Sequence, residues 1–464
     1  MVDERSGSGL EKVNTIEADS GQEPFAGAFV QAMDAMKAAG GKIYYFVMDF
    51  DSRNPHWDKV LYFFKRSFEK NDSQLLILDV PDGFMNRPDF QGVNAIADRY
   101  CTECQGIIKV VNTEGAGSLL LQHTDVYIAK EQAITDPFAV RATASDIKVQ
   151  TVNEWLLGFV DEGIEDTRPL LSICIPTFNR ARFLKLTLDS IIGQPEFAQG
   201  LVEIVISDNC STDDTEKIGR LYDDTYSMIR YFRNDENVAG KNFNLVLCRA
   251  TGILRKLNND TCLNDPDSLS YMCRMAKKYM YMRPAMYFGN NPFDAGDNDY
   301  LLLMRPFLLR ESFHITWIAS FAAWAEDCEG IEDEFQQGEF LWQVRKIIEL
   351  INKRKAVAAC DKAFMNGVVT RKNYPASWLW QVFHDDYFSI IDKYITEDDK
   401  AYIEKDLLYH HFGAIRKMSE TYPDDMKIDE DYDKTIALHY QDKPYWNDYC
   451  ESYKSWHDKT FAER

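Results

Sequence analysis

Four short, largely apolar runs between residues 170 and 260 constrain the fold more than any other feature of the chain, because each run ends directly in a polar turn. The runs lie at residues 170–175, 202–206, 229–233 and 253–257. A strand of a parallel sheet is buried on both faces and reads as a continuous apolar run, and the carboxyl ends of such strands are where α/β sheets bind ligands. The runs therefore predict a parallel sheet with one ligand site along one edge.

Helical segments separate these predicted strands. Residues 181–194 and 241–250 both carry apolar side chains at helical spacing. The polar stretch at residues 211–214 reads Ser-Thr-Asp-Asp, a composition typical of a helix N-cap that needs no ligand to explain it. The alternation of strand and helix predicts an α/β fold for this part of the chain.

Four motifs in these turns, in this order and spacing, resemble those of family 2 glycosyltransferases of the GT-A fold. They read IPTFNR, ISDNCSTDD, NDENVAGKNFN and LNNDTC, and they begin at Ile175, Ile206, Asn234 and Leu257. The resemblance covers residues 170–289, a quarter of the chain. It implies a Rossmann-like catalytic domain at residues 166–330 that binds a nucleotide-diphosphate sugar and transfers the sugar with inversion.

The resemblance also implies roles for residues in the turns. Asp208 would accept a hydrogen bond from the N–H of a uracil-like base, which implies a UDP-linked donor. Asn258 and Asp260 would hold a divalent cation, Mn²⁺ or Mg²⁺, on the diphosphate, because a hard cation neutralises the charge of this leaving group. The other residues that the resemblance places around the nucleotide and donor are Pro176, Thr177, Asn179, Arg180, Asn209, Gly240 and Asn259.

Two positions depart from the family pattern. Asn209 stands in place of the second aspartate of the second motif, and Asn258 stands in place of the first aspartate of the fourth. One carboxylate with one amide carbonyl holds a hard cation more weakly than two carboxylates do. Two alternatives therefore remain open: an Asx turn formed by Asn258 and Asp260 without any ligand, and a catalytically weak or inactive nucleotide-sugar-binding scaffold subunit that partners an active transferase.

An inverting transferase needs a base that accepts the proton of the acceptor hydroxyl. In the family this base is a carboxylate downstream of the metal motif, and we predict Asp327 in this role, with Glu326 as the second choice. An acidic pair on an ordinary helix surface is the open alternative. His314 lies just upstream and either contacts the diphosphate or is a hydrogen-bonded core histidine.

Residues 25–165 predict a smaller α/β domain with an accessory role. Apolar strands alternate with helical segments, as in a small open parallel sheet, and no glycine-rich phosphate loop occurs among them. Asp49 and Asp51 follow the first strand, where they would either bind a metal or nucleotide or cap the next helix. Residues 1–24 carry little that could be buried and predict a mobile tail.

Residues 331–464 predict a C-terminal helical domain that shapes the acceptor side. Apolar residues recur at helical spacing in residues 340–354 and 377–391. The second segment carries an aromatic stripe that either stacks on sugar rings or packs between helices in the core. The stripe consists of Trp378, Trp380, Phe383, Tyr387 and Phe388.

The composition excludes some classes of partner. A formal net charge of −22 repels the phosphates of nucleic acids and of anionic lipids, so we expect no nucleic-acid binding, and peripheral membrane contact only through a local basic or apolar patch. No run reaches the roughly 20 apolar residues of a spanning helix, and the N-terminus has no signal-peptide h-region, which predicts a soluble cytoplasmic protein. The ten cysteines are expected to be reduced and mostly buried; a zinc or redox role for the C-x-x-C of Cys101 and Cys104 is the weaker alternative.

Together these features predict a transferase that uses a UDP-linked sugar and acts on a glycan, lipid-linked or protein-linked acceptor in cell-surface polysaccharide or glycoprotein biosynthesis. The competing class is the scaffold subunit. A nucleotidyltransferase, which would release pyrophosphate, is disfavoured because the chain has no glycine-rich phosphate loop.

Overall fold

The computed structural model describes residues 15–16, 23–48, 56–68, 73–81, 83–84, 87–103, 106–112, 117–130, 136–157, 168–290, 298–336, 338–367, 372–424 and 426–461. Asp49, Asp51, Cys104 and most of the predicted tail lie outside these residues. The cysteines whose side chains are described are free thiols, most of them buried as predicted. None of the helices in the described ranges has the length and apolar composition of a membrane span.

The chain forms two compact units. The first consists of Met1–Thr167 with the short segments Lys278–Pro284 and Arg354–Ala356, and the second consists of Arg168–Lys277, Ala285–Lys353 and Val357–Arg464.

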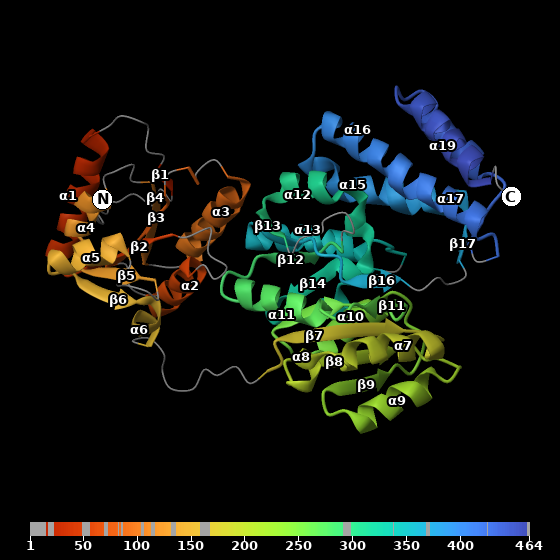
Figure 1. Cartoon of the computed structure of the whole chain (residues 1–464), viewed down its shortest axis with the longest axis horizontal. Coiled ribbons are helices and arrows are strands. Elements are labelled where there is room, and N and C mark those ends of the chain that lie inside the picture. Colours follow the sequence, from red (N-terminus) through yellow and green to blue (C-terminus); the bar gives the residue numbers. More distant parts are fainter. Residues whose placement is uncertain are drawn as a thin grey trace, which may run out of the picture. The chain divides into compact units, whose positions relative to one another are not determined.

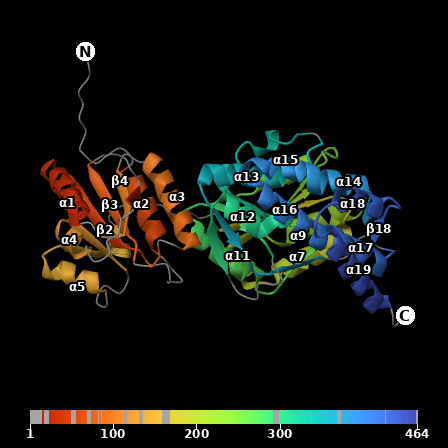
Figure 2. The same cartoon turned by 90° about the horizontal axis from the view of Figure 1, so that it is seen from above.

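The first unit is built on a six-stranded sheet in the order β1-β4-β3-β2-β5-β6, in which every pairing is parallel. Helices α1, α4 and α5 cover one face of this sheet, and α2 and α3 cover the other (Figures 1 and 2). The predicted small parallel sheet is therefore confirmed. Its strands are β1 (Thr15–Ile16), β2 (Lys42–Val47), β3 (Gln74–Asp79), β4 (Ile107–Val111), β5 (Val126–Ala129) and β6 (Lys148–Thr151). Its helices are α1 (Glu23–Ala38), α2 (Trp57–Ser67), α3 (Pro88–Glu103), α4 (Gly117–Gln122), α5 (Pro137–Ala144) and α6 (Val152–Leu157).

The second unit is built on an eight-stranded mixed sheet in the order β13-β15-β12-β14-β10-β7-β8-β9. The four predicted strands are its parallel half, β10-β7-β8-β9. The chain builds outward from β7 to β9 and then returns to place β10 on the other side of β7. The strands are β7 (Leu171–Thr177), β8 (Val202–Asp208), β9 (Ile229–Arg233), β10 (Leu254–Leu257), β12 (Ala285–Phe288), β13 (Asp299–Leu302), β14 (Phe321–Trp324) and β15 (Val357–Cys360).

That return creates a topological switch point between β7 and β10, which is where open α/β sheets bind ligands. Because crossovers between parallel strands are right-handed, α7 (Ala181–Ile192) and α9 (Thr215–Thr225) lie together on one face, and α10 (Lys241–Arg249) lies on the other (Figure 1).

The direction of strand β14 determines at which edge of the sheet the residues that follow each strand lie. It runs antiparallel to both β10 and β12, and β15 runs parallel to β12. The carboxyl ends of β7, β8, β9, β10, β12 and β15 therefore share one edge, which we call the carboxyl edge. Strand β14 begins at this edge and ends at the opposite one, which we call the amino edge.

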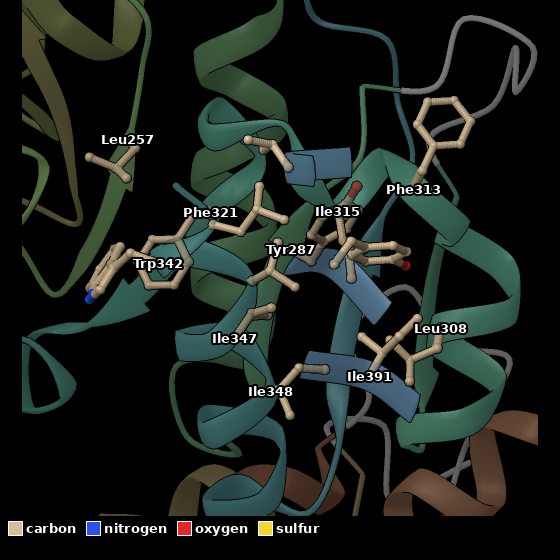
Figure 3. Packing of buried hydrophobic residues seen from close by; sticks show 14 of the residues in the cluster. Leu257, Tyr287, Leu308, Phe313, Ile315, Phe321, Trp342, Ile347, Ile348 and Ile391 are labelled. Atoms are coloured by element: carbon tan, nitrogen blue, oxygen red, sulfur yellow. The ribbon is translucent and has the colours of Figure 1, made fainter. Parts of the chain in front are cut away.

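The C-terminal helices share one apolar core with the sheet. Leu257 of β10 and Tyr287 of β12 belong to the same buried cluster as Trp342 and Ile347 of α13 and Ile391 of α15 (Figure 3). The predicted helical character of this region is confirmed, although β15 within it joins the central sheet, which the sequence did not indicate. The helices from α11 onward are α11 (Ser268–Tyr279), α12 (Met304–Glu311), α13 (Trp342–Arg354), α14 (Ala376–Trp380), α15 (Tyr387–Ile391), α16 (Glu397–Asp406), α17 (Gly413–Thr421), α18 (Tyr432–Tyr440) and α19 (Trp446–Phe461).

Candidate functional site

The residues that end β7 and β10 meet at the switch point. The hydroxyl of Thr177, the last residue of β7, donates a hydrogen bond to Oδ2 of Asp260 at 2.8 Å. The hydroxyl of Thr187 on α7 donates to the backbone oxygen of Asp260 at 2.9 Å. Burial raises the pKa of Asp260 to about 6, although the bond from Thr177 and the charge of Arg180 both act to lower it. The carboxylate is thus held in place at a position where a cation would stabilise its charge.

Asn258 lies beside this carboxylate and is fully buried. Its backbone N–H donates to the Cys174 oxygen of β7 at 2.8 Å, and its Nδ2 donates to the Asn259 oxygen at 3.0 Å. Its Oδ1 has no hydrogen-bond partner, so the Asx turn, in which this oxygen would accept, does not account for it. A buried polar atom without a partner is costly and calls for an explanation, such as an ion or a water molecule.

These oxygens fit a hard divalent cation that is shared with a diphosphate. Mg²⁺ is commonly held by one or two carboxylates together with substrate phosphates and water, and Asp260 with Asn258 supplies such a partial set. In the ranges that the structure describes, no three His, Cys, Asp or Glu side chains converge on a metal site. Oxygens of the diphosphate and water molecules would supply the remaining ligands of the cation.

The turn after β7 is tied to the turn after β8. Asn179 adopts a positive φ of 52°; its N–H donates to Ser211 Oγ at 2.8 Å, and its Oδ1 accepts from the N–H of Thr212 at 2.7 Å. The N–H of Arg180 donates to Thr215 Oγ1 at 3.0 Å. Asp214, the N-cap residue of α9, makes no side-chain cap hydrogen bond, and the N–H of Thr215 donates to Asp213 Oδ1 at 3.0 Å instead. The polar stretch that we predicted as a helix cap thus shapes the neighbouring loop. Pro176 lies within β7, paired with Ser207 of β8.

Asp208, the last residue of β8, is fully buried. Its Oδ1 accepts a hydrogen bond from the N–H of Ser211 at 2.9 Å, and its Oδ2 accepts one from the Tyr231 hydroxyl. Both carboxylate oxygens are therefore engaged inside the protein, and a nucleotide base would reach them only if these neighbours moved. The predicted contact with a base stays a prediction.

Asn209 organises the loop between β9 and α10. Its Oδ1 accepts from the N–H of Val238 at 2.9 Å, and its Nδ2 donates to Asn237 Oδ1 at 2.8 Å and to the Ala239 oxygen at 3.2 Å. The amide both donates and accepts in this network, which a carboxylate at this position could not do. These hydrogen bonds explain in structural terms why an asparagine occupies the position where the family has an aspartate.

Gly240 begins α10 at the carboxyl edge and brings a distant segment to the site. A Cβ atom on Gly240 would lie 2.6 Å from Cε2 of Phe335, so the ring occupies the space that the glycine leaves free. Further along α10, Asn244 Nδ2 donates to the Ile331 oxygen at 2.6 Å, and Cys248 Sγ donates to the Cys328 oxygen at 3.5 Å. Residues 328–335 therefore run along α10 from the amino edge to the carboxyl edge.

Residues 172–313 match the family described as Glycosyl transferase family 2. The matched residues contain β8 to β10, all of β7 except its first residue, and every turn at the carboxyl ends of these strands. Residues 172–313 are a family 2 glycosyltransferase domain. The match, together with the strand order, also confirms the predicted GT-A fold of this transferase domain.

Curated relatives match short stretches of the chain. The abequosyltransferase RfbV of Salmonella typhimurium is 41% identical over 85 residues, which are 18% of this chain and 25% of that protein. The GalNAc(5)-diNAcBac-PP-undecaprenol beta-1,3-glucosyltransferase of Campylobacter jejuni is 37% identical over 76 residues, which are 16% of this chain and 24% of that protein. The chain thus spans about a quarter of the length of these relatives.

Solved structures of glycosyltransferases are also similar, at low identity. The mannosyltransferase PcManGT from Pyrobaculum calidifontis, solved with GDP-Man and Mn²⁺, has 16% identity and a TM-score of 0.38, covering 63% of this chain and 84% of that one. Staphylococcus aureus TarS, solved with UDP-GlcNAc, has 16% identity and a TM-score of 0.37, covering 61% of this chain and 80% of the TarS chain.

The structure does not bring the predicted base, Asp327, to the transferase site. Asp327 follows β14, whose last residue Trp324 pairs with Leu254 at the start of β10. It therefore lies at the amino edge, whereas Asp260 lies at the carboxyl edge, and Glu326 shares this placement. The buried carboxylate of Asp327 instead forms an ion pair with Lys353 at 2.7 Å. This placement argues against Asp327 as the base, and it follows from the antiparallel direction of β14, which the sequence does not reveal.

Two glutamates that we did not predict lie between the contact with Gly240 and helix α13. Glu334 precedes Phe335 and forms an ion pair with Lys346 at 2.7 Å, and Glu339 forms one with Arg345 at 2.6 Å. Both cations belong to the first turns of α13. The only sequence signal for these residues was their position downstream of the transferase domain.

The aromatic stripe of the C-terminal region is divided between the core and the surface. Trp380, Tyr387 and Phe388 are buried, as expected of a core stripe. Trp378 is half-buried, and its ring meets that of the exposed Phe340 edge-on at 5.7 Å. His314 is exposed, and its ring lies 4.2 Å from the Phe313 ring.

Proposed function

We propose that the chain is an inverting glycosyltransferase that moves a sugar from a UDP-linked donor to a glycan, lipid-linked or protein-linked acceptor in cell-surface polysaccharide or glycoprotein biosynthesis. The observation that carries the proposal is the switch-point corner, where Thr177 and Asp260 join β7 to β10 within a family 2 transferase domain. The names of the curated relatives, one of which acts on an undecaprenol-linked saccharide, support the acceptor class. The proposal places the enzyme in the cytoplasm, with no nucleic-acid partner.

The nucleotide would lie across the carboxyl edge between the turn at residues 177–180 and the loop at residues 234–240. Asp260 and Asn258 would hold Mn²⁺ or Mg²⁺ on the diphosphate. When bound there, the cation would supply positive charge that stabilises the departing diphosphate. Thr177 would keep the Asp260 carboxylate in the orientation that this requires.

In the transfer step, the acceptor oxygen forms a bond to the anomeric carbon while the bond from that carbon to the diphosphate oxygen breaks. The bonding electron pair leaves with the nucleoside diphosphate, and the hydroxyl proton passes to a carboxylate. Glu334 and Glu339 are our candidates for this base. Glu334 precedes Phe335, which lies beside Gly240 at the carboxyl edge, and Glu339 lies between that segment and α13.

Calorimetric titration with UDP, with and without Mn²⁺, followed by an assay of donor hydrolysis and transfer, tests this function. We expect UDP binding that Mn²⁺ strengthens, and we expect Asp260→Asn to remove the effect of Mn²⁺. Absence of nucleotide binding in the wild-type protein would refute the proposal.

The second candidate is the scaffold subunit that binds a nucleotide sugar without turning it over. Asn258 in place of an aspartate favours it, because this residue leaves one carboxylate at the cation site. The same experiment separates the two functions: tight UDP binding without turnover of any donor and acceptor would favour the scaffold.

A further inference from the structure

Lys256 occupies the middle of β10 and is 0% exposed. Its ammonium donates to the Leu257 oxygen at 3.0 Å and to the Ala319 oxygen at 2.7 Å. It also lies 5.8 Å and 5.1 Å from the ring centres of Phe288 and Phe364. None of these partners carries a negative charge.

A buried ammonium without a carboxylate partner is expensive for a fold. Lys346, another buried lysine of the same unit, has Glu334 as a partner at 2.7 Å. An apolar side chain of the same length would fill the space between the two phenylalanine rings without the cost. Packing therefore does not explain a lysine at this position.

The two carbonyl groups that Lys256 binds belong to Leu257 and Ala319, near the residues proposed to hold the cation. Leu257 is the last residue of β10 and directly precedes Asn258. Ala319 belongs to the 3₁₀ helix Ile318–Ser320, which directly precedes β14 at the carboxyl edge. On its other side, Asn258 is fixed to Cys174 of β7. The ammonium thus ties the end of β10 to the start of β14 immediately before the residues that would hold the cation.

We infer that Lys256 is a positioning residue of the donor site, which fixes the end of β10 so that Asn258 and Asp260 are held where the diphosphate and its cation bind. The inference rests on the proposed function. Residues that orient metal ligands through hydrogen bonds typically change metal affinity or activity by 10–100-fold when they are mutated.

The test is Lys256→Met, which keeps the length and the apolar stem but removes the charge and both hydrogen bonds. We expect a melting temperature at or above that of the wild type without ligand, because the desolvated charge is gone. We also expect UDP affinity in Mn²⁺ to fall roughly 10- to 100-fold by calorimetry. Lys109→Met, which replaces a lysine 2% exposed on β4 of the first unit, is the matched control and should leave UDP affinity unchanged.

The outcomes are separable. Equal UDP affinity in the wild type and Lys256→Met would overturn the inference alone. Failure of Lys256→Met to fold would also overturn it, because the lysine would then serve the fold itself. A wild-type protein that binds no nucleotide diphosphate would overturn the proposed function, and the inference with it.

Discussion

The Thr177 hydroxyl donates a hydrogen bond to the carboxylate of Asp260 across the switch point, at 2.8 Å and over a sequence separation of 83 residues. The carboxylate is therefore oriented by the strand next to its own before any ligand arrives. A cation binds more tightly to ligands that are already oriented, because the entropy of ordering these side chains is lost during folding and not on binding.

Thr177→Val should weaken Mn²⁺-assisted UDP binding roughly 10-fold, because valine keeps the shape of threonine but leaves the Asp260 carboxylate without its donor. The free energy of unfolding should change by only about 1 kcal/mol, which is typical of one hydrogen bond. Calorimetry and urea unfolding measure the two effects. Thr177→Ser restores the hydroxyl and should recover the affinity; UDP affinity equal to that of the wild type in Thr177→Val would contradict the role.

Asn258→Asp should strengthen Mn²⁺ binding in the presence of UDP, because it adds a second carboxylate to the cation site. Without the cation the same change should lower the melting temperature, since the side chain is fully buried and its Oδ1 has no donor. Thermal unfolding with and without UDP and Mn²⁺ gives both quantities. A variant whose response to Mn²⁺ matches that of the wild type would argue against a cation at this corner.

Asp327→Asn should leave transfer near the wild-type rate, because Asp327 lies at the amino edge. It should lower the free energy of unfolding by about 1–3 kcal/mol, since it weakens a charge-assisted bond of a buried carboxylate. Glu334→Gln and Glu339→Gln are the informative comparison: loss of transfer with retained UDP affinity in one of them identifies the base. If only Asp327→Asn lost transfer, Asp327 would be the base, as we predicted from the sequence.

Glu311→Gln should make stability less dependent on pH. Burial and the neighbouring Asp361 raise the pKa of Glu311 from 4.5 to about 8. Between these values the folded protein keeps a proton that the unfolded chain releases, so wild-type stability falls as pH rises through this window and levels off above it. Glutamine stays neutral and should remove that decline in urea unfolding between about pH 5 and 9. An identical pH profile in both proteins would show that Glu311 is ionised in the fold.

Phe340→Ala should raise the KM for the acceptor and leave UDP affinity unchanged. Phe340 is 54% exposed, follows Glu339, and packs edge-on against Trp378 at 5.7 Å, so it presents a rigid aromatic surface on which a sugar ring can stack. Leu438→Ala, at a leucine 69% exposed on α18, is the control for loss of exposed apolar area. If the acceptor KM of Phe340→Ala equals that of the wild type, the Phe340 ring does not contribute to acceptor binding.

The parallel half of the transferase sheet could be predicted from the sequence because β7 and β8 are buried along almost their whole length and each of the four strands ends in a polar turn. A shared edge for the carboxyl ends follows from parallel pairing alone. That reasoning brought Thr177, Asn258 and Asp260 together, as the structure does. It also anticipated that only one of the two residues proposed to hold the cation, Asp260, is a carboxylate.

Strand direction was beyond such reasoning. The segment Phe321–Trp324 reads as an apolar strand, and nothing in its residues indicates that it runs antiparallel to β10. A carboxylate after an antiparallel strand lies at the opposite edge, so the sequence could not show that Asp327 lies away from Asp260. Long-range packing could not be predicted from the sequence either. The contact of Phe335 with Gly240 depends on how residues 328–335 follow α10.

That contact between Phe335 and Gly240 has a kinetic consequence. The loop at residues 234–240 and the segment that carries Glu334 touch directly, with a ring filling the space of a missing side chain. We therefore expect that an adjustment of the loop around a nucleotide would displace the segment that carries Glu334 in the same movement. An enzyme built in this way should bind its substrates in a fixed order, with the donor first and the released nucleotide competing with the donor alone.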